Sequence, residues 1–260
     1  MDQKLEKKHT GATFTPKELA DYLSKRLIQY VEAKNYFNVL DPACGDGELL
    51  ISIGKHLNNL GIDYSLSGFD SNDSYLKDAK DRIINNLGGN PDLFNQDFLN
   101  AINISNVQES LDLFEDQKTQ GVNNKFDLII ANPPYVRTQI LGTKQAQALA
   151  KKFNLKGRVD LYYPFLIAMT ESLKNEGIIG VITSNRYLST KSGESVRKYL
   201  SKNYNILEVI DLGDTKLFDA AVLPAIFIGK RKKSHHNSTA NFIKLYEDQN
   251  GYNGKIQSSD

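Results

Sequence analysis

The chain has 260 residues, of which 40% are hydrophobic and 24% are charged, the profile of a soluble globular protein with one large α/β domain or two small ones. Its 32 basic and 31 acidic residues leave a formal charge of +1, so any contact with nucleic acid is expected from a local patch or from a part that this chain lacks. No apolar run approaches the roughly 20 residues of a membrane span, and the single cysteine, Cys44, excludes an internal disulfide framework.

The same limits bear on location and on metals. The opening residues, MDQKLEKKHTG, have no apolar core and are therefore not a secretory signal. A single cysteine fits a reducing cytoplasm, and Cys and His are too few and too scattered for a structural zinc site. We expect a cytoplasmic protein without a metal and without a membrane partner.

The first element expected is a helix over residues 15–33. Thr15 is a candidate N-cap, Pro16 suits the first helical position, and Glu18 completes a capping box. Its apolar residues share one face at helical spacing, and these are Leu19, Tyr22, Leu23, Leu27 and Ile28.

The next elements alternate between strand and helix. Residues 37–57 predict a strand, a glycine-containing loop and a helix, and residues 64–70 predict a second strand followed by a helix to about residue 87. A short third strand and its exit follow over 92–99. Residues 101–124 are polar and irregular, which indicates an insertion, and 125–135 contain the fourth strand.

A long polar stretch with several basic residues covers 136–160. Beyond it we expect an amphipathic helix over 160–175, a buried strand over 177–184, a helix over 193–203, and strands over 205–213 and 222–231, with one more possible strand at 240–246. Because strands and helices alternate, the fold class is α/β, doubly wound, with a mostly parallel sheet and helices on both faces.

Two glycines mark the first strand–helix junction. Gly45 and Gly47 let the backbone approach a ligand at a helix N-terminus, although Leu50 occupies the third glycine position of the dinucleotide-binding pattern. Asp70, at the end of the second strand, lies where a carboxylate can hold ribose hydroxyls. Taken alone, Asp70 is better explained as a turn or helix-capping aspartate.

The fourth strand ends unusually, because the apolar run of residues 128–131 stops at Asn132-Pro133-Pro134-Tyr135. Prolines have a fixed φ near −65° and no N–H, so this turn is stiff and rich in acceptors. Such a strand end can hold an amino group, because its carbonyl oxygens accept hydrogen bonds from the N–H donors.

Taken together, D-P-A-C-G-x-G, the acid after the second strand, Asp97-Phe98 and N-P-P-Y resemble S-adenosylmethionine-dependent amino-methyltransferases. The segment GATFTPKELADYL ahead of the glycine loop makes the chain similar to the γ class, the TaqI-like DNA adenine-N6 methyltransferases of restriction–modification systems. The resemblance covers about residues 10–230. It implies a seven-stranded, Rossmann-like methyltransferase sheet with an antiparallel last strand, S-adenosylmethionine as the cofactor and double-stranded DNA as the partner.

The resemblance also implies a role for each matching residue. Thr15 would contact the methionine part of the cofactor, Asp70 the ribose hydroxyls and Asp97 the adenine amine, with Phe98 beside the ring. The loop under the cofactor would consist of Asp41, Pro42, Ala43, Gly45 and Gly47, with Asn132 adjoining it.

The catalytic turn would be residues 132–135. The Asn132 side-chain oxygen and the Pro133 carbonyl would accept the N–H groups of the target amine, and Pro134 would stiffen the turn. Tyr135 would receive the flipped base, with Phe218 as a second stacking residue and Arg137 as a substrate contact. Phe218 is explained equally well as a core anchor at a strand entry.

Other functions stay open at this point. A release-factor glutamine methyltransferase uses the same turn on a planar amide, and an RNA base amine is a further possible acceptor. A non-catalytic DNA-binding subunit would be expected to have lost the glycine loop or N-P-P-Y, and both are intact. Cytosine-C5 chemistry is not favoured, because Cys44 lies in the cofactor loop.

The domain organisation expected is a catalytic domain over 1–232, followed by a polar tail over 233–260 or the start of a linker to a missing target-recognition domain. A separate specificity subunit would serve the same purpose. We also expect the basic stretch 137–158 to meet nucleic acid, with a solvated insertion as the alternative.

Overall fold

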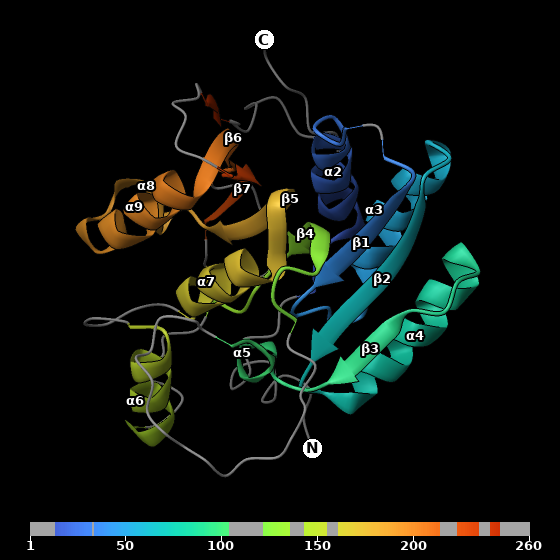
Figure 1. Cartoon of the computed structure of the whole chain (residues 1–260), viewed down its shortest axis with the longest axis horizontal. Helices are drawn as coiled ribbons and strands as arrows, with labels where there is room; N and C mark the ends of the chain where they lie inside the picture. The colour runs from blue at the N-terminus through green and yellow to red at the C-terminus, as the bar shows by residue number, and fades with distance from the viewer. Residues whose placement is uncertain are drawn as a thin grey trace, which may run out of the picture.

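The computed structural model describes residues 14–32, 34–103, 122–135, 143–154, 161–213, 223–233 and 240–244. Within them, eight strands form one sheet in the order β3-β2-β1-β4-β5-β7-β6-β8 (Figure 1). The strands are β1 (Tyr36–Asp41), β2 (Asp63–Asp70), β3 (Asp92–Asn95), β4 (Phe126–Ala131), β5 (Leu173–Ser184), β6 (Tyr204–Asp211), β7 (Pro224–Arg231) and β8 (Asn241–Lys244).

Strands β1 to β5 pair in parallel, whereas β7 lies antiparallel between β5 and β6. The α/β class, the mostly parallel sheet and the antiparallel core strand are therefore confirmed. The described residues contain one strand more than the seven expected, since β8 pairs in parallel with β6 at the sheet edge. β8 falls within the possible strand expected at 240–246, inside the segment 233–260 that was otherwise expected to be a tail or linker.

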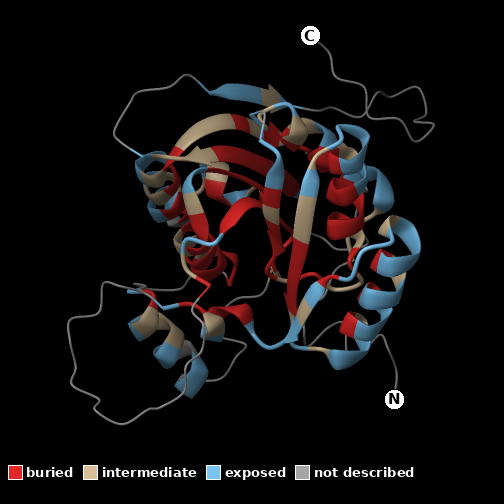
Figure 2. Ribbon diagram, turned by 45° about the vertical axis from the view of Figure 1, so that its right-hand side comes forward, coloured by how far each residue is buried: buried red, intermediate tan, exposed pale blue. Residues whose placement is uncertain are grey.

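Helices cover both faces of this sheet (Figures 1 and 2). On one face lie α2 (Lys17–Ile28), α3 (Glu48–Asn59) and α4 (Asp73–Leu87), and on the other lie α5 (Phe98–Ala101), α7 (Tyr162–Ser172), α8 (Arg186–Ser189) and α9 (Glu194–Asn203). Each face has its own hydrophobic cluster.

The alternation of side chains along β4 explains the two clusters. Leu128 and Ile130 pack in the cluster under α2 and α3, while Ile129 and Ala131 pack in the cluster under α7. Successive side chains of a strand point to opposite faces, so a strand covered on both sides is apolar along most of its length. All six residues of β4 are buried, which fixes the position of the turn that follows.

The start of the first helix differs from the expectation. Pro16 is the N-cap, Lys17 is the first helical residue, and no side chain caps this end. Thr15, the predicted N-cap, therefore lies one residue before the observed one, and its hydroxyl is available to another partner. The apolar face is confirmed, with Leu19, Leu23 and Leu27 fully buried.

The polar stretch after the fourth strand contains a helix that was not expected, α6 (Thr143–Lys152). Its sequence, TKQAQALAKK, consists mainly of strong helix formers, and this propensity outweighs the low apolar content. Leu149 and Phe153 pack against the cluster that contains α7, and Lys152 donates from Nζ to the carbonyl of Leu99 at 2.6 Å. Most of the predicted insertion, residues 104–121, lies outside the described part.

A buried ion pair joins the first helix to the far half of the sheet. Glu208 on β6 is 1% exposed and accepts from Arg26 Nε at 2.9 Å and from Arg26 Nη2 at 2.5 Å, while the Tyr30 hydroxyl donates to the same carboxylate. All of these bonds run to residues about 180 positions away in the sequence. They hold α2, and with it Thr15, against the sheet.

Candidate active site

Four of the predicted polar residues lie at the carboxyl ends of neighbouring parallel strands. Asp41 ends β1, Asp70 ends β2, Asp97 follows β3 by two residues, and Asn132 directly follows β4. These strands are adjacent in the order β3-β2-β1-β4, and the chain reverses its direction of progress across the sheet between β1 and β4. Such a switch point is where open α/β sheets bind ligands.

The glycine loop between β1 and α3 has the conformation that glycine permits. Gly45 has φ +51° and Gly47 has φ +80°, and Gly47 is the N-cap of α3. A Cβ at Gly47 would lie 3.2 Å from both Ala79 Cβ and Ile83 Cδ1 of α4, so a side chain is excluded there. The loop is anchored because Cys44 N donates to the Phe69 carbonyl at 2.8 Å.

A pocket opens above this loop, between β1 and β4. The empty space within the pocket, including open solvent at its mouth, is about 250 Å³. It is lined by Phe14, Thr15, Asp41, Ala43, Cys44, Gly45, Asp46, Glu48, Leu49 and Asn132. The pocket thus brings together Thr15, the glycine loop and Asn132, the first residue of the turn after β4, from a span of 117 positions in the sequence.

Asp41 is the most deeply buried acid of the pocket, at 1% exposure. Its Oδ1 accepts from Ala43 N at 3.1 Å, which closes the turn at the end of β1. Burial raises the pKa of Asp41 to about 8, and the nearby carboxylates of Asp70 and Asp46 act in the same direction.

Asp70 connects the second strand to the glycine loop. Its Oδ2 accepts from Gly45 N at 3.0 Å and its Oδ1 accepts from Asn72 N at 2.9 Å. The helix cap is Asn72, whose side chain accepts from Ser74 N and Tyr75 N. Asp70 is therefore a turn aspartate that also holds the loop, and partial burial raises the pKa of its carboxyl.

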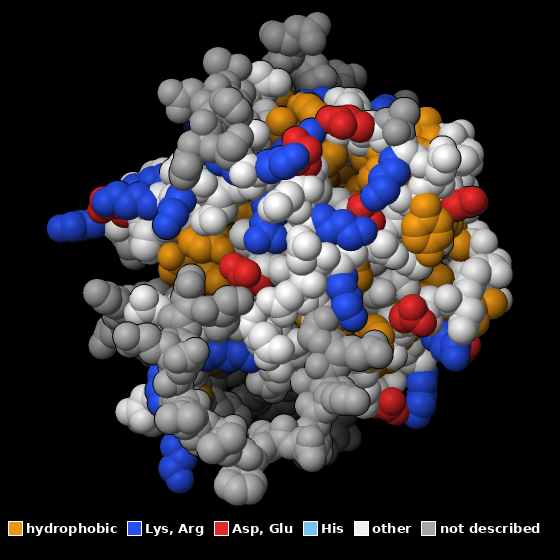
Figure 3. Space-filling model, viewed as in Figure 1, with side chains coloured by type: hydrophobic (Ala, Val, Ile, Leu, Met, Phe, Trp, Pro, Cys, Tyr) orange, Lys and Arg blue, Asp and Glu red, His pale blue; other side chains and the backbone are white. Residues whose placement is uncertain are grey.

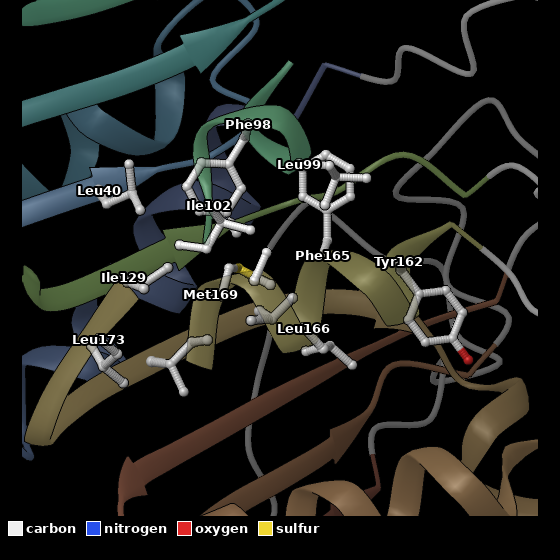
Figure 4. Packing of buried hydrophobic residues seen from close by; sticks show 14 of the residues in the cluster. Leu40, Phe98, Leu99, Ile102, Ile129, Tyr162, Phe165, Leu166, Met169 and Leu173 are labelled. Atoms are coloured by element: carbon white, nitrogen blue, oxygen red, sulfur yellow. The ribbon is translucent and has the colours of Figure 1, made fainter. Parts of the chain in front are cut away.

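Asp97 and Phe98 have structural roles in the described fold. Asp97 is exposed and caps α5, with Oδ1 accepting from Leu99 N at 2.9 Å. Phe98 is 1% exposed and packs between the rings of Phe69 and Phe165, with centroid distances of 5.3 Å and 6.2 Å (Figure 4). The predicted contacts of this pair with a cofactor adenine stay a prediction, and almost none of the Phe98 ring is open to a ligand.

The turn after β4 joins its own Asn132 and Tyr135 to Thr15, which lies 117 positions before Asn132. Asn132 is 9% exposed, and its Nδ2 donates to Thr15 Oγ1 at 3.0 Å. The Tyr135 hydroxyl donates to Asn132 Oδ1, and burial raises the pKa of that hydroxyl, so it keeps its proton. Pro133 is buried and Pro134 is half-buried, which keeps the turn rigid.

Two of the predicted substrate residues, Arg137 and Phe218, lie outside the described residues. Of the basic stretch 137–158, the structure describes α6 and the two residues that follow it. Within α6, Lys144 and Lys151 are exposed, whereas Lys152 donates to the Leu99 carbonyl. On the face drawn in Figure 3, Lys and Arg side chains are dispersed, several of them beside acidic side chains.

The contacts by which α4 holds the glycine loop were not predicted from the sequence. Arg82 Nη1 donates to the Asp46 carbonyl at 2.7 Å and pairs with Asp46 Oδ2 at 2.5 Å, and Nη2 pairs with Glu48. Tyr75 meets the Phe14 ring edge-on at 5.1 Å. Tyr75, Ala79 and Arg82 are spaced i, i+4, i+7, the one signal that places them on a single face of the helix.

Sheet order, glycine loop and turn define the class, which is the fold of the S-adenosylmethionine-dependent methyltransferases. A solved structure from Listeria monocytogenes, described as a class I S-adenosylmethionine-dependent methyltransferase, matches with a TM-score of 0.66 and 22% identity over 89% of this chain and 65% of that one. The family model described as Eco57I restriction-modification methylase matches residues 46–218, more than half of the sequence. The chain belongs to this family.

Two curated relatives are informative. The Type II methyltransferase M.BanIII of Aneurinibacillus aneurinilyticus is 47% identical over 94% of this chain and 43% of its own length. A release factor glutamine methyltransferase of Flavobacterium psychrophilum is 26% identical over 72% of this chain and 59% of its own length. The chain thus spans less than half of the first relative and somewhat more than half of the second.

The described residues contain neither a membrane-spanning helix nor a metal-binding cluster. None of the helices in this part of the chain is long and apolar enough to cross a membrane. Among the same residues, His, Cys, Asp and Glu form no group of three or more that could hold a metal ion.

Proposed function

We propose that this chain transfers a methyl group from S-adenosylmethionine to the N6 amine of an adenine that is flipped out of double-stranded DNA, as part of a restriction–modification system. The observation that carries the proposal is the position of Asn132, whose carboxamide borders both the pocket over the glycine loop and the rigid turn after β4. A methyl donor in that pocket and an amine at that turn would be neighbours.

The residues that line the pocket suit the cofactor. Gly45 and Gly47 leave room for close approach, and a Cβ at Gly45 would already lie 3.4 Å from the Phe14 ring. Asp46 and Glu48 line the pocket, and S-adenosylmethionine has a cationic sulfonium and a cationic amino group that ionised acids attract. The bound cofactor supplies an activated methyl group.

The turn suits an amine as acceptor. The lone pair of an aromatic amine is delocalised into the ring, so the nitrogen attacks only when its N–H groups are held by acceptors. Asn132 Oδ1 and the Pro133 carbonyl are neutral acceptors on a rigid backbone, and they would stabilise the positive charge that develops on nitrogen without reorganising. Holding the amine in line with the methyl group would supply much of the rate.

The same residues argue against a covalent route through cysteine. Cys44 is the one cysteine of the sequence, it is 5% exposed, and burial raises the pKa of its thiol. A thiol that stays protonated is a poor nucleophile. This favours direct transfer to an amine over methylation at cytosine C5.

Recognition of the target sequence is proposed to need a further part. The M.BanIII relative is more than twice as long as the matched region, and the described surface shows no concentrated basic patch on the face drawn in Figure 3. We propose that a target-recognition domain or a specificity subunit supplies this part. A glutamine side chain in a protein is the second candidate acceptor. Its carboxamide also presents a planar NH₂ group, and one relative is named a release factor glutamine methyltransferase.

The test is methyl transfer from labelled S-adenosylmethionine to duplex DNA, RNA and a protein extract in parallel, at enzyme concentrations high enough for weak binding. We expect label in DNA, and Asn132→Ala should lower the rate at least about a hundredfold, comparable to the loss of an oxyanion-hole donor. Cofactor binding by the variant should persist. Label in protein alone would point to the glutamine reaction.

A further inference from the structure

The carboxamide of Asn132 is bonded at both of its ends. Nδ2 donates to Thr15 Oγ1 at 3.0 Å, and the Tyr135 hydroxyl donates to Oδ1. A carboxamide has one acceptor end and one donor end, so these two contacts decide which atom faces the target side of the turn. With Nδ2 directed at Thr15, the acceptor oxygen is directed at Tyr135.

Thr15 is free to hold the amide because it does not cap a helix. The N-cap of α2 is Pro16, and no side chain caps that end. Helix α2 is itself fixed to the sheet, since Arg26 pairs with the buried Glu208. Thr15 is therefore presented to Asn132 by a firmly held helix, across 117 positions in the sequence.

Tyr135 is hydrogen-bonded to Asn132 Oδ1, the oxygen that would accept a hydrogen bond from the target amine in the proposed reaction. Its side chain is half-buried and packs against the hydrophobic cluster under α2 and α3. Its hydroxyl donates a hydrogen bond to Asn132 Oδ1. In the proposed reaction an N–H of the target amine would donate to the same atom. The oxygen is thus already satisfied within the protein, which avoids the cost of a buried acceptor without a partner.

We propose that Thr15 is a positioning residue that fixes the Asn132 amide, and that the Tyr135 hydroxyl holds the place of the target amine until substrate binds. The inference rests on the proposed function. It assigns Thr15 a role towards Asn132 in addition to the cofactor contact that the family resemblance implies. Binding of the amine exchanges one hydrogen bond to Oδ1 for another.

The first test is independent of activity. In the full chain labelled with ¹⁵N, the Asn132 side-chain NH₂ signal, identified by its loss in Asn132→Asp, should exchange slowly with solvent in the wild type and in Thr15→Ser. It should exchange at least tenfold faster in Thr15→Val, which has the same shape but no acceptor. Equal exchange in Thr15→Val and the wild type would overturn the role of Thr15, whether or not the chain methylates DNA.

The second test separates kcat from KM. Thr15→Val should lower kcat about tenfold or more, whatever its effect on the cofactor KM, with recovery of kcat in Thr15→Ser. A raised cofactor KM at unchanged kcat would assign Thr15 to the cofactor alone and overturn the proposal.

Tyr135→Phe tests the hydroxyl while it keeps the ring. Loss of one competing hydrogen bond should lower the KM for DNA about two- to tenfold, without a loss in kcat. Tyr163→Phe is the matched control, because the Tyr163 hydroxyl donates to Ser195 O at 3.5 Å on a different element, and it should leave KM unchanged. An unchanged or raised KM in Tyr135→Phe would overturn the placeholder role. A wild type without methyl transfer to any acceptor would instead refute the proposed function.

Discussion

Four carboxylates surround the glycine loop, and their partners differ. Asp46 and Glu48 share Arg82, Asp70 accepts two backbone N–H groups, and Asp41 accepts one. A cationic ligand gains from ionised acids, whereas burial favours their neutral forms. The chemistry of each acid therefore follows from its own neighbours.

Asp41 should make stability depend on pH. Burial raises its pKa to about 8 in the folded chain from an ordinary value of 3.8, so between these values the folded state binds more protons than the unfolded state. The free energy of unfolding should then fall as the pH rises from about 5 to about 8, and level off above. Urea unfolding at several pH values should show a smaller fall in Asp41→Asn. An equal fall in both proteins would place the titration elsewhere.

Asp70 should act on both the fold and the cofactor. Asp70→Ala removes the acceptor of Gly45 N and Asn72 N, and it should lower the free energy of unfolding by about 1–3 kcal/mol. If Asp70 also holds the ribose hydroxyls, calorimetric titration should show cofactor affinity weaker by about 1–3 kcal/mol. Reduced stability with unchanged affinity would leave Asp70 a loop anchor only.

At the scale of elements, helix α2 depends on one buried ion pair. Arg26→Met leaves Glu208, which is 1% exposed, without its cation, and should lower the free energy of unfolding by about 3–5 kcal/mol. The matched control is Glu32→Ala, which breaks the exposed pair with Lys230 and should change stability little. Denaturant unfolding of the two variants is the measurement, and equal effects would contradict the account.

Helix α6 allows a matched test of DNA contact. Lys151 is exposed, whereas Lys152 is tied to the Leu99 carbonyl at 2.6 Å. Lys151→Gln should reduce the slope of log affinity against log salt on duplex DNA by about 0.9 if this residue meets a phosphate. Lys152→Gln should leave the slope unchanged and lower stability instead. Unchanged slopes in both variants would exclude Lys151 and Lys152 from phosphate contacts.

Sequence reasoning was most reliable where local pattern and burial agree. The strands β1, β2 and β4 and the turn at Asn132 were predicted, because apolar runs that end in glycine, aspartate or proline carry a local signal. Helix α6 was missed, since its helix propensity was judged by polarity alone. The cap at Thr15 was wrong, because the hydroxyl found a tertiary partner in Asn132.

Tertiary contacts also explain why parts of the site could not be predicted. Arg82 holds the glycine loop only because α4 packs beside α3, and no local pattern encodes that contact. Phe98 follows the family motif, yet its ring is held in the core by Phe69 and Phe165. A motif specifies which residue occupies a position, whereas packing decides what its side chain touches.

For the whole molecule, the central claim concerns the carboxyl ends of the parallel strands. There a pocket proposed to hold the cofactor lies next to a turn proposed to hold the target amine. Asn132 is the residue common to both, and it lies at the switch point of the sheet order. The surrounding fold and the family agree with methyl transfer. The identity of the methylated atom is the most specific part of the proposal.

The measurement that tests this claim most directly is nucleoside analysis of DNA incubated with the 260-residue chain and S-adenosylmethionine. After enzymatic digestion, mass spectrometry should find N6-methyladenine, and its amount should drop at least about a hundredfold with Asn132→Ala. Methylcytosine in place of N6-methyladenine, or equal yields from the wild type and Asn132→Ala, would contradict the account.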